Sequence, residues 1–481
     1  MIRFGTPVAR WVIAATVLGS GIAFLDGTVV NVALPAIAKD LDTDIAGLQW
    51  VVDAYLVTLT SLLLLGGALG DHYGHRRVFT IGLGAFTVAS VICAAAPNAA
   101  LLALARALQG AGGALLVPGS LAIIGATFVT TDRGRAIGAW SGMAGVASAI
   151  GPFLGGWLID TASWRWVFLI NVPLALVAIV ITLRHVPETK AREPAPLDWT
   201  GAALATIGLA AASYALIEST VEVGPREIGA AIVGVVAITA FFVVESSVAH
   251  PMLPLRLFRS SQFSGANATT LAVYAALGAL TFFLVLELQL ALGYSALEAG
   301  AALLPVTILM LTLSSRAGAL AQRIGPRIPM TVGPIVVGVG MLMFTRVAPG
   351  ESYWAAVFPA AVVFGLGLAL TVAPLTATVL GAVADEEMGV ASAVNNAAAR
   401  LAGLLAVAVL PSVVGLSTEL APAELSDKTS TAILICAALA ALGGVIAFFT
   451  VRTSRLIASN PPAADLSQPC HDPCVTTAVG D

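Results

Sequence analysis

The sequence has few charged residues for its length. Lys and Arg number 23 and Asp and Glu 27 in a chain of 481 residues, so charged residues make up 10% of it, against about 25% in soluble proteins. Apolar runs of about 20 residues recur along the whole chain, which is typical of helices that cross a bilayer. The short alternating segments of membrane β-barrels are a different pattern. The composition therefore predicts an all-α polytopic membrane protein surrounded by a lipid bilayer.

Cysteine is also scarce, and the motifs of common enzymes are missing. Cys93 and Cys436 fall in apolar runs, while Cys470 and Cys474 lie close together near the end of the sequence. We expect that last stretch to be a disordered, oxidisable tail rather than a metal site, because no second pair of ligands follows it. No HExxH motif and no GxSxG motif within a helix occurs, so we expect no enzyme, no metal and no cofactor.

The sequence also gives no sign of nucleic-acid binding or of a cleavable signal peptide. The formal net charge of −4 comes without a basic patch, so we expect no nucleic acid as a partner. The first apolar run is too long for a cleavable signal peptide and lacks a small-residue cleavage site.

The apolar runs predict fourteen membrane spans, separated by Gly, Pro and charged clusters. The expected spans are residues 9–37, 47–70, 78–96, 99–127, 136–159, 165–183, 198–217, 228–248, 264–292, 297–317, 328–347, 352–380, 389–416 and 430–451. Sixteen of the 23 Lys and Arg residues then lie on the side that holds both termini, and five lie on the other side. By the positive-inside rule, both termini are expected in the cytoplasm, with the protein in the cell membrane.

The sequence contains an internal repeat. GALGDHYGHR at Gly67–Arg76 matches GALAQRIGPR at Gly318–Arg327, 251 residues later. Asp132 and Asp385 are a second pair of landmarks at nearly the same offset. We therefore expect an N-terminal six-helix bundle (1–196), two inserted helices (197–249), a C-terminal six-helix bundle (250–455) and a cytoplasmic tail (456–481). Duplicated halves of this kind place the substrate site between them, near the bilayer midplane.

The repeated loop carries Gly67, Asp71, Gly74, Arg76 and Arg77. An ordinary turn with positive charges on the cytoplasmic side would account for these residues. The loop also resembles the loop motif of the major facilitator superfamily. The resemblance implies that Asp71 caps a helix of the other half, near Gly389, and so acts as a conformational latch. A carboxylate at a helix N-terminus contributes about 0.3–1 kcal/mol.

Further stretches resemble the fourteen-helix drug:proton antiporters of that superfamily, which implies the major facilitator fold. They are Leu25–Pro35, Arg106 with Gln109 and Gly110, Trp164–Pro173, Pro251–Phe258, and the antiporter motif of Gly151, Pro152, Gly155 and Gly156. In physical terms, Gly151 and Gly155 form a small-residue face that lets helices approach closely, and Pro152 bends its helix.

Asp26 lies about halfway along the first expected span, where a carboxylate costs about 2.5–3.5 kcal/mol on insertion scales. One interpretation is a buried acid held by hydrogen bonds from neighbouring helices. The other is a group that gains and loses a proton during transport. Arg106 is expected at a similar depth in the fourth span, and a nearby positive charge favours the carboxylate form. The resemblance implies that Asp26 and Arg106 couple transport to protons.

The remaining polar residues within spans give candidates for a substrate cavity, with Asn31, Asp53, Trp50, Tyr55 and Glu287 as its expected members. Asp53 could meet a cationic substrate beside aromatic rings or lie in the outer vestibule, and Glu287 could be an interfacial acid. Because the acids Asp26, Asp53 and Glu287 outnumber the base Arg106, neutral and cationic substrates are expected rather than anions. Arg400 is expected to form a structural ion pair between the halves, since an unpaired buried charge is costly.

The residues together predict a proton-coupled antiporter that exports small amphipathic drugs or antibiotics by alternating access. An alternative is a dedicated exporter of one metabolite or of an antibiotic made by the cell itself. A membrane receptor or an intramembrane enzyme belongs to a different class, and the sequence does not support it. The expected partners are protons, an amphipathic small molecule and the bilayer, and the expected functional unit is a monomer.

Overall fold

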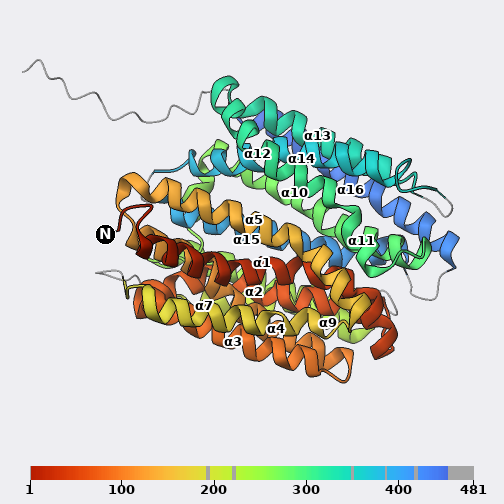
Figure 1. Ribbon diagram of the computed structural model, residues 1–481, viewed down its shortest axis with the longest axis horizontal. Helices are drawn as coiled ribbons and strands as arrows, with labels where there is room; N and C mark the ends of the chain where they lie inside the picture. Colours follow the sequence, from red (N-terminus) through yellow and green to blue (C-terminus); the bar gives the residue numbers. More distant parts are fainter. Residues whose placement is uncertain are drawn as a thin grey trace, which may run out of the picture.

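The computed structural model describes residues 2–190, 196–218, 224–347, 351–384, 387–416 and 421–452. The expected tail with Cys470 and Cys474, and the landmark Asp385, lie outside the described residues. Long helices run side by side along one direction, and the N-terminus lies at one end of them (Figure 1). We call that end the N-terminal face and the other end the far face.

The first bundle contains six long helical segments and one short one. They are α1 (Pro7–Leu41), α2 (Ile45–Tyr73), α3 (His75–Ala95), α4 (Ala99–Thr127), α5 (Thr130–Thr161), α6 (Trp166–Leu169) and α7 (Asn171–His185). The side chains of Asp44 and Asn98 cap the first turns of α2 and α4, as these residue types do at helix N-termini. Gly74 separates α2 from α3 with a φ of 103°, a conformation that favours glycine.

The remaining helices form an inserted pair and a second bundle. The inserted pair is α8 (Trp199–Glu218) and α9 (Pro225–Ser247). The second bundle contains η1 (Leu255–Arg259), α10 (Ser261–Leu286) with the π-helical turn η2 (Glu287–Ala291), α11 (Ala296–Ala302), α12 (Leu304–Ile324), α13 (Arg327–Phe344), α14 (Val357–Leu380), α15 (Met388–Val414) and α16 (Pro422–Thr450).

Fourteen of these segments within the described residues are long and apolar enough to cross a membrane. The expected number of spans is therefore confirmed. Three spans are made of two consecutive elements each, namely α6 with α7, α10 with η2, and α11 with α12. Several helices begin earlier than expected; α5, for example, starts at residue 130 rather than near 136. Polar first turns explain this difference, because the apolar pattern starts only after them.

Each bundle packs mainly within itself, and α5 and α15 lie between the two in Figure 1. The inserted helices pack on each other, and α8 packs against α2 and α15, so it covers a seam where the two bundles meet. Thr206 of α8 donates a hydrogen bond to Ser61 of α2 (2.9 Å), and Ser412 of α15 donates one to the carbonyl of Leu216 (3.4 Å).

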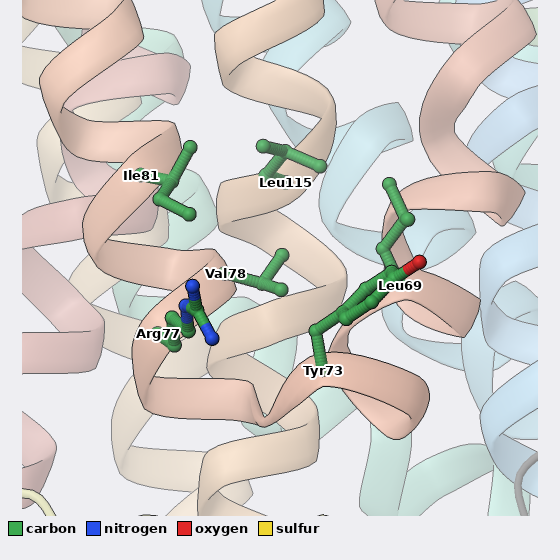
Figure 2. A pocket seen from close by; sticks show the side chains of 6 residues that line it. All are labelled: Leu69, Tyr73, Arg77, Val78, Ile81 and Leu115. Atoms are coloured by element: carbon green, nitrogen blue, oxygen red, sulfur yellow. The ribbon is translucent and has the colours of Figure 1, made fainter.

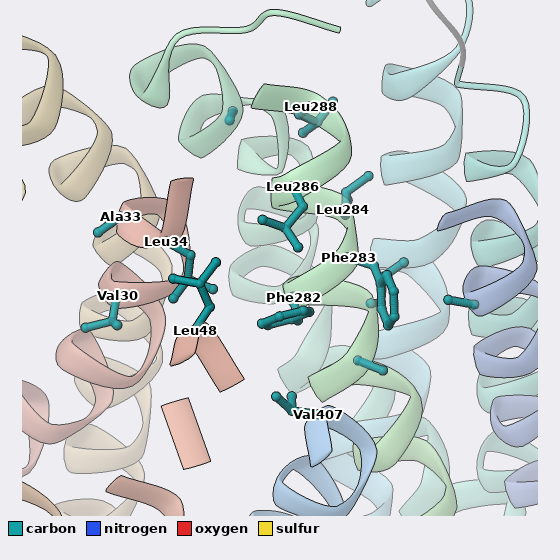
Figure 3. Packing of buried hydrophobic residues seen from close by; sticks show 14 of the residues in the cluster. Val30, Ala33, Leu34, Leu48, Phe282, Phe283, Leu284, Leu286, Leu288 and Val407 are labelled. Carbon is teal, nitrogen blue, oxygen red and sulfur yellow. The ribbon is translucent and has the colours of Figure 1, made fainter. Parts of the chain in front are cut away.

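The largest apolar core joins the two bundles in the half of the molecule nearer the far face. Val30 and Leu34 of α1 and Leu48 of α2 belong to the same cluster as Phe282 of α10 and Val407 of α15 (Figure 3). A second cluster lies almost wholly within the first bundle, and a third within the second bundle. Apolar packing therefore seals the space between the bundles toward the far face.

Candidate functional site

A buried ion pair lies at the centre of the first bundle. Asp26 of α1 is fully buried, and the side chain of Arg106 of α4 is 2% exposed. Nη1 of Arg106 donates a hydrogen bond to the Asp26 carboxylate, and Nε of Arg106 donates one to the carbonyl oxygen of Val51 (3.0 Å). The structure thus brings together the two residues that the sequence singled out for proton coupling.

Amide and hydroxyl groups from three helices complete this site. The side-chain amides of Gln109 and Asn171 each donate a hydrogen bond to Oδ1 of Asp26, at 2.9 and 3.0 Å. Gln109 also donates a hydrogen bond to Oγ of Ser90 (2.9 Å). With Arg106, these groups satisfy both carboxylate oxygens without water, which is what a buried charge requires.

Gln109, Asn171 and Ser90 were not among the residues expected at this site. Gln109 lies one helical turn after Arg106, so helical spacing already places both on one face of α4. Asn171 is the first residue of α7 and is fully buried. A polar amide in an apolar run is unusual, so this position could have been predicted from the sequence as a candidate for the site. Ser90 carries no such signal, because small hydroxyl residues are common in membrane helices.

Aromatic rings fix the position of the Arg106 side chain. Its Cζ atom lies 4.2 Å from the ring centroid of Tyr55 and 5.8 Å from that of Phe168. The Tyr55 hydroxyl donates a hydrogen bond to the carbonyl of Ala23 (3.2 Å). Arg106 therefore contacts α2 through both Val51 and Tyr55.

The structure does not bring the five expected cavity residues together. Asp53 is fully buried, and neither of its carboxylate oxygens has a hydrogen-bond partner among the described residues. Glu287 is 2% exposed and accepts a hydrogen bond from Ser426 (2.6 Å) inside the second bundle. The Trp50 indole donates to Glu218 of the inserted helix α8 (2.9 Å).

Of the remaining two expected members, Tyr55 is 1% exposed, whereas Asn31 is partly exposed. The five expected cavity residues have different surroundings for a simple reason. Residue type shows that a polar group lies within a span, but neighbouring positions on a helix point in different directions.

Arg400 of α15 lies against the first bundle, with its Cζ atom 5.5 Å from the ring centroid of Phe24 of α1. A structural ion pair was expected at this position. No described acid lies within ion-pair distance of Arg400, so the structure does not form that pair. Arg400 is partly exposed, so water can solvate its charge in place of an acid.

In the loop between α2 and α3, the acid Asp71 and the base Arg76 have different partners. Asp71 is half-exposed and lies 3.5 Å from Nε2 of His75. No hydrogen bond or ion pair joins Asp71 to α15 within the described part of the chain, and the backbone around Gly389 is open. The expected latch contact is thus not made in this conformation, and the latch itself stays a prediction.

The basic part of the loop holds the segment that follows α7. Glu188 accepts a hydrogen bond from the backbone N–H of Arg76 (3.0 Å) and lies 3.5 Å from its Nε. Nη1 of Arg76 also donates to the carbonyl of Val186 (3.3 Å). Glu188 packs closely on Gly74, which has no side chain to obstruct it. Arg76 and Gly74 therefore anchor the beginning of the linker that leads to α8.

Arg77 and Gly67 lie elsewhere around the same loop. Arg77 borders a pocket of about 270 Å³ on the surface of α2, α3 and α4 (Figure 2). The other residues that line it are Leu69, Tyr73, Val78, Ile81 and Leu115. Gly67 faces Pro118 of α4, where an added methyl group would lie 3.5 Å away. The pocket contains none of the residues of the Asp26 site and is almost entirely apolar.

The glycines of the antiporter motif allow α5 to pack closely on two partners. Gly151 and Gly155 face Thr28 and Val29 of α1, while Gly156 faces α11 of the other bundle. A methyl group at Gly156 would lie 2.5 Å from Cα of Leu297, closer than real contacts allow. The small-residue face predicted from Gly151 and Gly155 therefore packs on α1, and Gly156 allows a second close approach, to α11. Pro152 lies at the same contact, because its backbone packs on Gly300 of α11.

Within the described residues, the hydrogen bonds that join the two bundles lie at the far face. Asp160 of α5 accepts hydrogen bonds from the backbone N–H groups of Ala296 and Leu297 of α11. Gln49 of α2 donates to the carbonyls of Val407 and Ala408 of α15. Gln289 of η2 donates to the carbonyl of Val32 of α1 (2.9 Å).

Asp160, Gln49 and Gln289 were not predicted as contacts between the bundles. They lie near helix ends, where polar residues are common, and only the fold shows that they face the other bundle.

Comparison with known proteins relates this architecture to a large family. The Major Facilitator Superfamily profile matches residues 16–407. The puromycin resistance protein pur8 of Streptomyces alboniger is 34% identical over 473 residues, which cover 95% of this chain and 93% of that protein. The uncharacterised MFS-type transporter EfpA of Mycobacterium tuberculosis is 35% identical over 427 residues, which cover 84% and 78%. Other relatives are named as a multidrug resistance protein and a cephamycin export protein.

Solved structures show the same fold. The crystal structure of a bacterial homologue of the human lysosomal transporter Spinster aligns with a TM-score of 0.66 at 14% identity, covering 93% of this chain and 98% of that one. The matches confirm the fold and the family that the motifs indicated, and these relatives are transporters rather than enzymes. The chain is a multi-pass membrane transporter and belongs to the Major Facilitator Superfamily.

Proposed function

We propose that the protein is a proton-coupled antiporter that exports small amphipathic drugs or antibiotics across the cell membrane. Export is supported by relatives that are named as resistance and export proteins. The observation that carries proton coupling is the Asp26 site, in which one fully buried carboxylate accepts hydrogen bonds from Arg106, Gln109 and Asn171. Intramembrane acids of this kind mark proton pathways in transporters.

The positions of the contacts between the bundles support alternating access. The described hydrogen bonds between the bundles lie at the far face, as does most of the apolar core that joins them. If the N-terminal face is cytoplasmic, as the Lys and Arg distribution indicates, the molecule is closed toward the outside. Compounds would then enter from the cytoplasm, and the Asp71 latch would engage only in the opposite conformation.

Arg106 would transmit the protonation state of Asp26 to the contact between the bundles. Adding a proton to Asp26 removes the charge that holds Nη1 of Arg106, while Arg106 still binds the carbonyl of Val51 and the ring of Tyr55. Those residues belong to α2, which packs against α15 of the second bundle. The residues 1–196 and 250–455 would move as two units in a single chain, with the inserted helix α8 covering one seam between them.

An export assay tests this function. Inverted membrane vesicles containing the protein would be given a panel of fluorescent amphipathic dyes, together with puromycin, with and without a proton gradient. Uptake that requires the gradient and releases protons from the vesicle lumen is expected, because antiport exchanges one for the other. Uptake that persists after the gradient is collapsed would rule out proton coupling.

The same panel tests the alternative of a dedicated exporter for one compound, which the name of the puromycin resistance relative favours. Transport of several unrelated dyes indicates a broad exporter. Transport of a single compound indicates a dedicated one.

A further inference from the structure

The acids that suggested cationic substrates are all buried, and two of them already have partners within one bundle. Asp26 is paired with Arg106, Asp53 is fully buried, and Glu287 is bonded within the second bundle. Counting acids against bases therefore says nothing about the charge that a substrate meets. Arg400 is the charged residue of this central region whose side chain is partly exposed among the described residues.

Helices of both bundles surround the Arg400 guanidinium. Its Cζ atom lies 5.5 Å from the ring centroid of Phe24 on α1, and Nη1 would lie 3.8 Å from a methyl group placed on Gly27 of the same helix. Arg400 itself lies near the middle of α15. The side chain therefore occupies the region between the bundles at mid-depth.

This guanidinium has no acceptor in the described part of the protein. It takes part in none of the ion pairs and donates no hydrogen bond there, although an Arg side chain carries five N–H donors. An arginine inside a membrane protein is costly and is kept where it has a partner or a function. Arg106 shows the first case, since acceptors on three residues surround it. Arg400 has no such acceptors and is partly exposed, so a ligand between the bundles could replace the water around it.

We propose that Arg400 binds the carboxylate of the transported compound, so that amphipathic carboxylic acids form a substrate class of this protein. The planar guanidinium matches a carboxylate with two parallel hydrogen bonds. Phe24 beside it offers an aromatic surface to the apolar part of the compound, and Asn31, one turn after Gly27, offers a partly exposed amide. The inference rests on the proposed function, because it assumes that substrates pass between the two bundles.

Two probes that differ in one charge test this inference. The full chain in lipid nanodiscs would be titrated at pH 7.5 with 1-pyrenebutyric acid, which is ionised, and with its methyl ester, and signals from empty nanodiscs would be subtracted. The parent protein should bind the acid about tenfold or more tightly than the ester, as a charge-assisted bidentate pair implies. Arg400→Gln should lose this preference by weakening the acid alone, and Arg400→Lys should keep part of it.

Arg327→Gln is the matched control, because Arg327 also lies against an aromatic ring, that of Phe448, but within the second bundle. This variant should keep the full preference for the acid. Equal binding of acid and ester by the parent, or an unchanged preference in Arg400→Gln, would overturn the inference. A parent that exports dyes but does not distinguish the two probes refutes this inference and leaves the proposed function standing. A parent that prefers the acid but exports no compound supports the recognition and refutes the function.

Discussion

Asp160 of the first bundle adds a second cap to the N-terminus of helix α11 in the second bundle, beside its own N-cap residue Ser295, since the Asp160 carboxylate accepts the N–H of Leu297 at 2.9 Å. The N–H of Ala296 is bound by the same carboxylate at 3.2 Å. This contact uses the chemistry that the sequence suggested for Asp71, but at the opposite face of the molecule. If Asp71 forms its predicted contact in the opposite conformation, each end state would be held by one acid at a helix N-terminus, and each switch would break one such contact.

The first prediction concerns Asp160. Replacing it with Ala should shift the equilibrium toward a conformation open at the far face, because losing a helix cap costs about 0.5–2 kcal/mol, or a factor of about 2–30. Spin labels at Thr161 and Tyr294, measured by electron–electron resonance, would report the separation of the bundles. Glu424→Ala, at another exposed acid of the far face, is the control. Identical distance distributions in the parent and Asp160→Ala would refute the role of this cap.

Gly156 carries the second prediction. Gly156→Ala should nearly abolish transport, because the added methyl group meets the backbone of α11 and prevents closure at the far face. Gly142→Ala on the same helix is the matched control, since a methyl group there meets nothing within 4 Å. Dye efflux and the amount of folded protein would be measured for both variants. Normal efflux by Gly156→Ala would show that the bundles need not approach so closely.

The third prediction is that Asp71→Asn leaves substrate binding nearly normal and slows transport several-fold. The loop that repeats this motif in the second half carries Gln322 instead of an acid, so only one of the two loops has the charge. A carboxylate at a helix N-terminus stabilises by about 0.3–1 kcal/mol, enough to change a balanced equilibrium about two- to fivefold. Dye binding and efflux rates would be compared in the same preparation. Equal efflux rates for parent and variant would show that Asp71 does not act as a conformational latch.

Membrane topology gives the fourth prediction. Single cysteines at Lys190 and Arg256 should react with impermeant reagents from the cytoplasm. A cysteine at Glu222, which lies outside the described residues, should react from outside, because α8 and α9 form a complete pair of spans between those positions. Reaction at position 222 from the cytoplasm would contradict the fourteen-span orientation.

The sequence predicted the number of spans and the pairing of Asp26 with Arg106 because both leave strong local signals. A charge inside an apolar run stands out, and two such charges at equal depth are natural partners. It did not predict where Asp53 and Glu287 point, because hydropathy does not identify the face of a helix in a segment that is apolar all round. Asp160 was missed for another reason. An acid at a helix end resembles any loop residue until the fold brings a second helix to it.

The measurement that tests the central claim most directly is proton-driven accumulation of a dye in inverted vesicles by Asp26→Asn. The substitution keeps the size of the side chain and removes the proton site. We expect gradient-driven accumulation to fall to the level of vesicles without the protein, dye binding to remain measurable, and Asp26→Glu to keep partial activity. If the Asn variant still concentrates the dye against its gradient, Asp26 is a structural residue, and proton coupling must reside elsewhere, at Asp53 or Glu287.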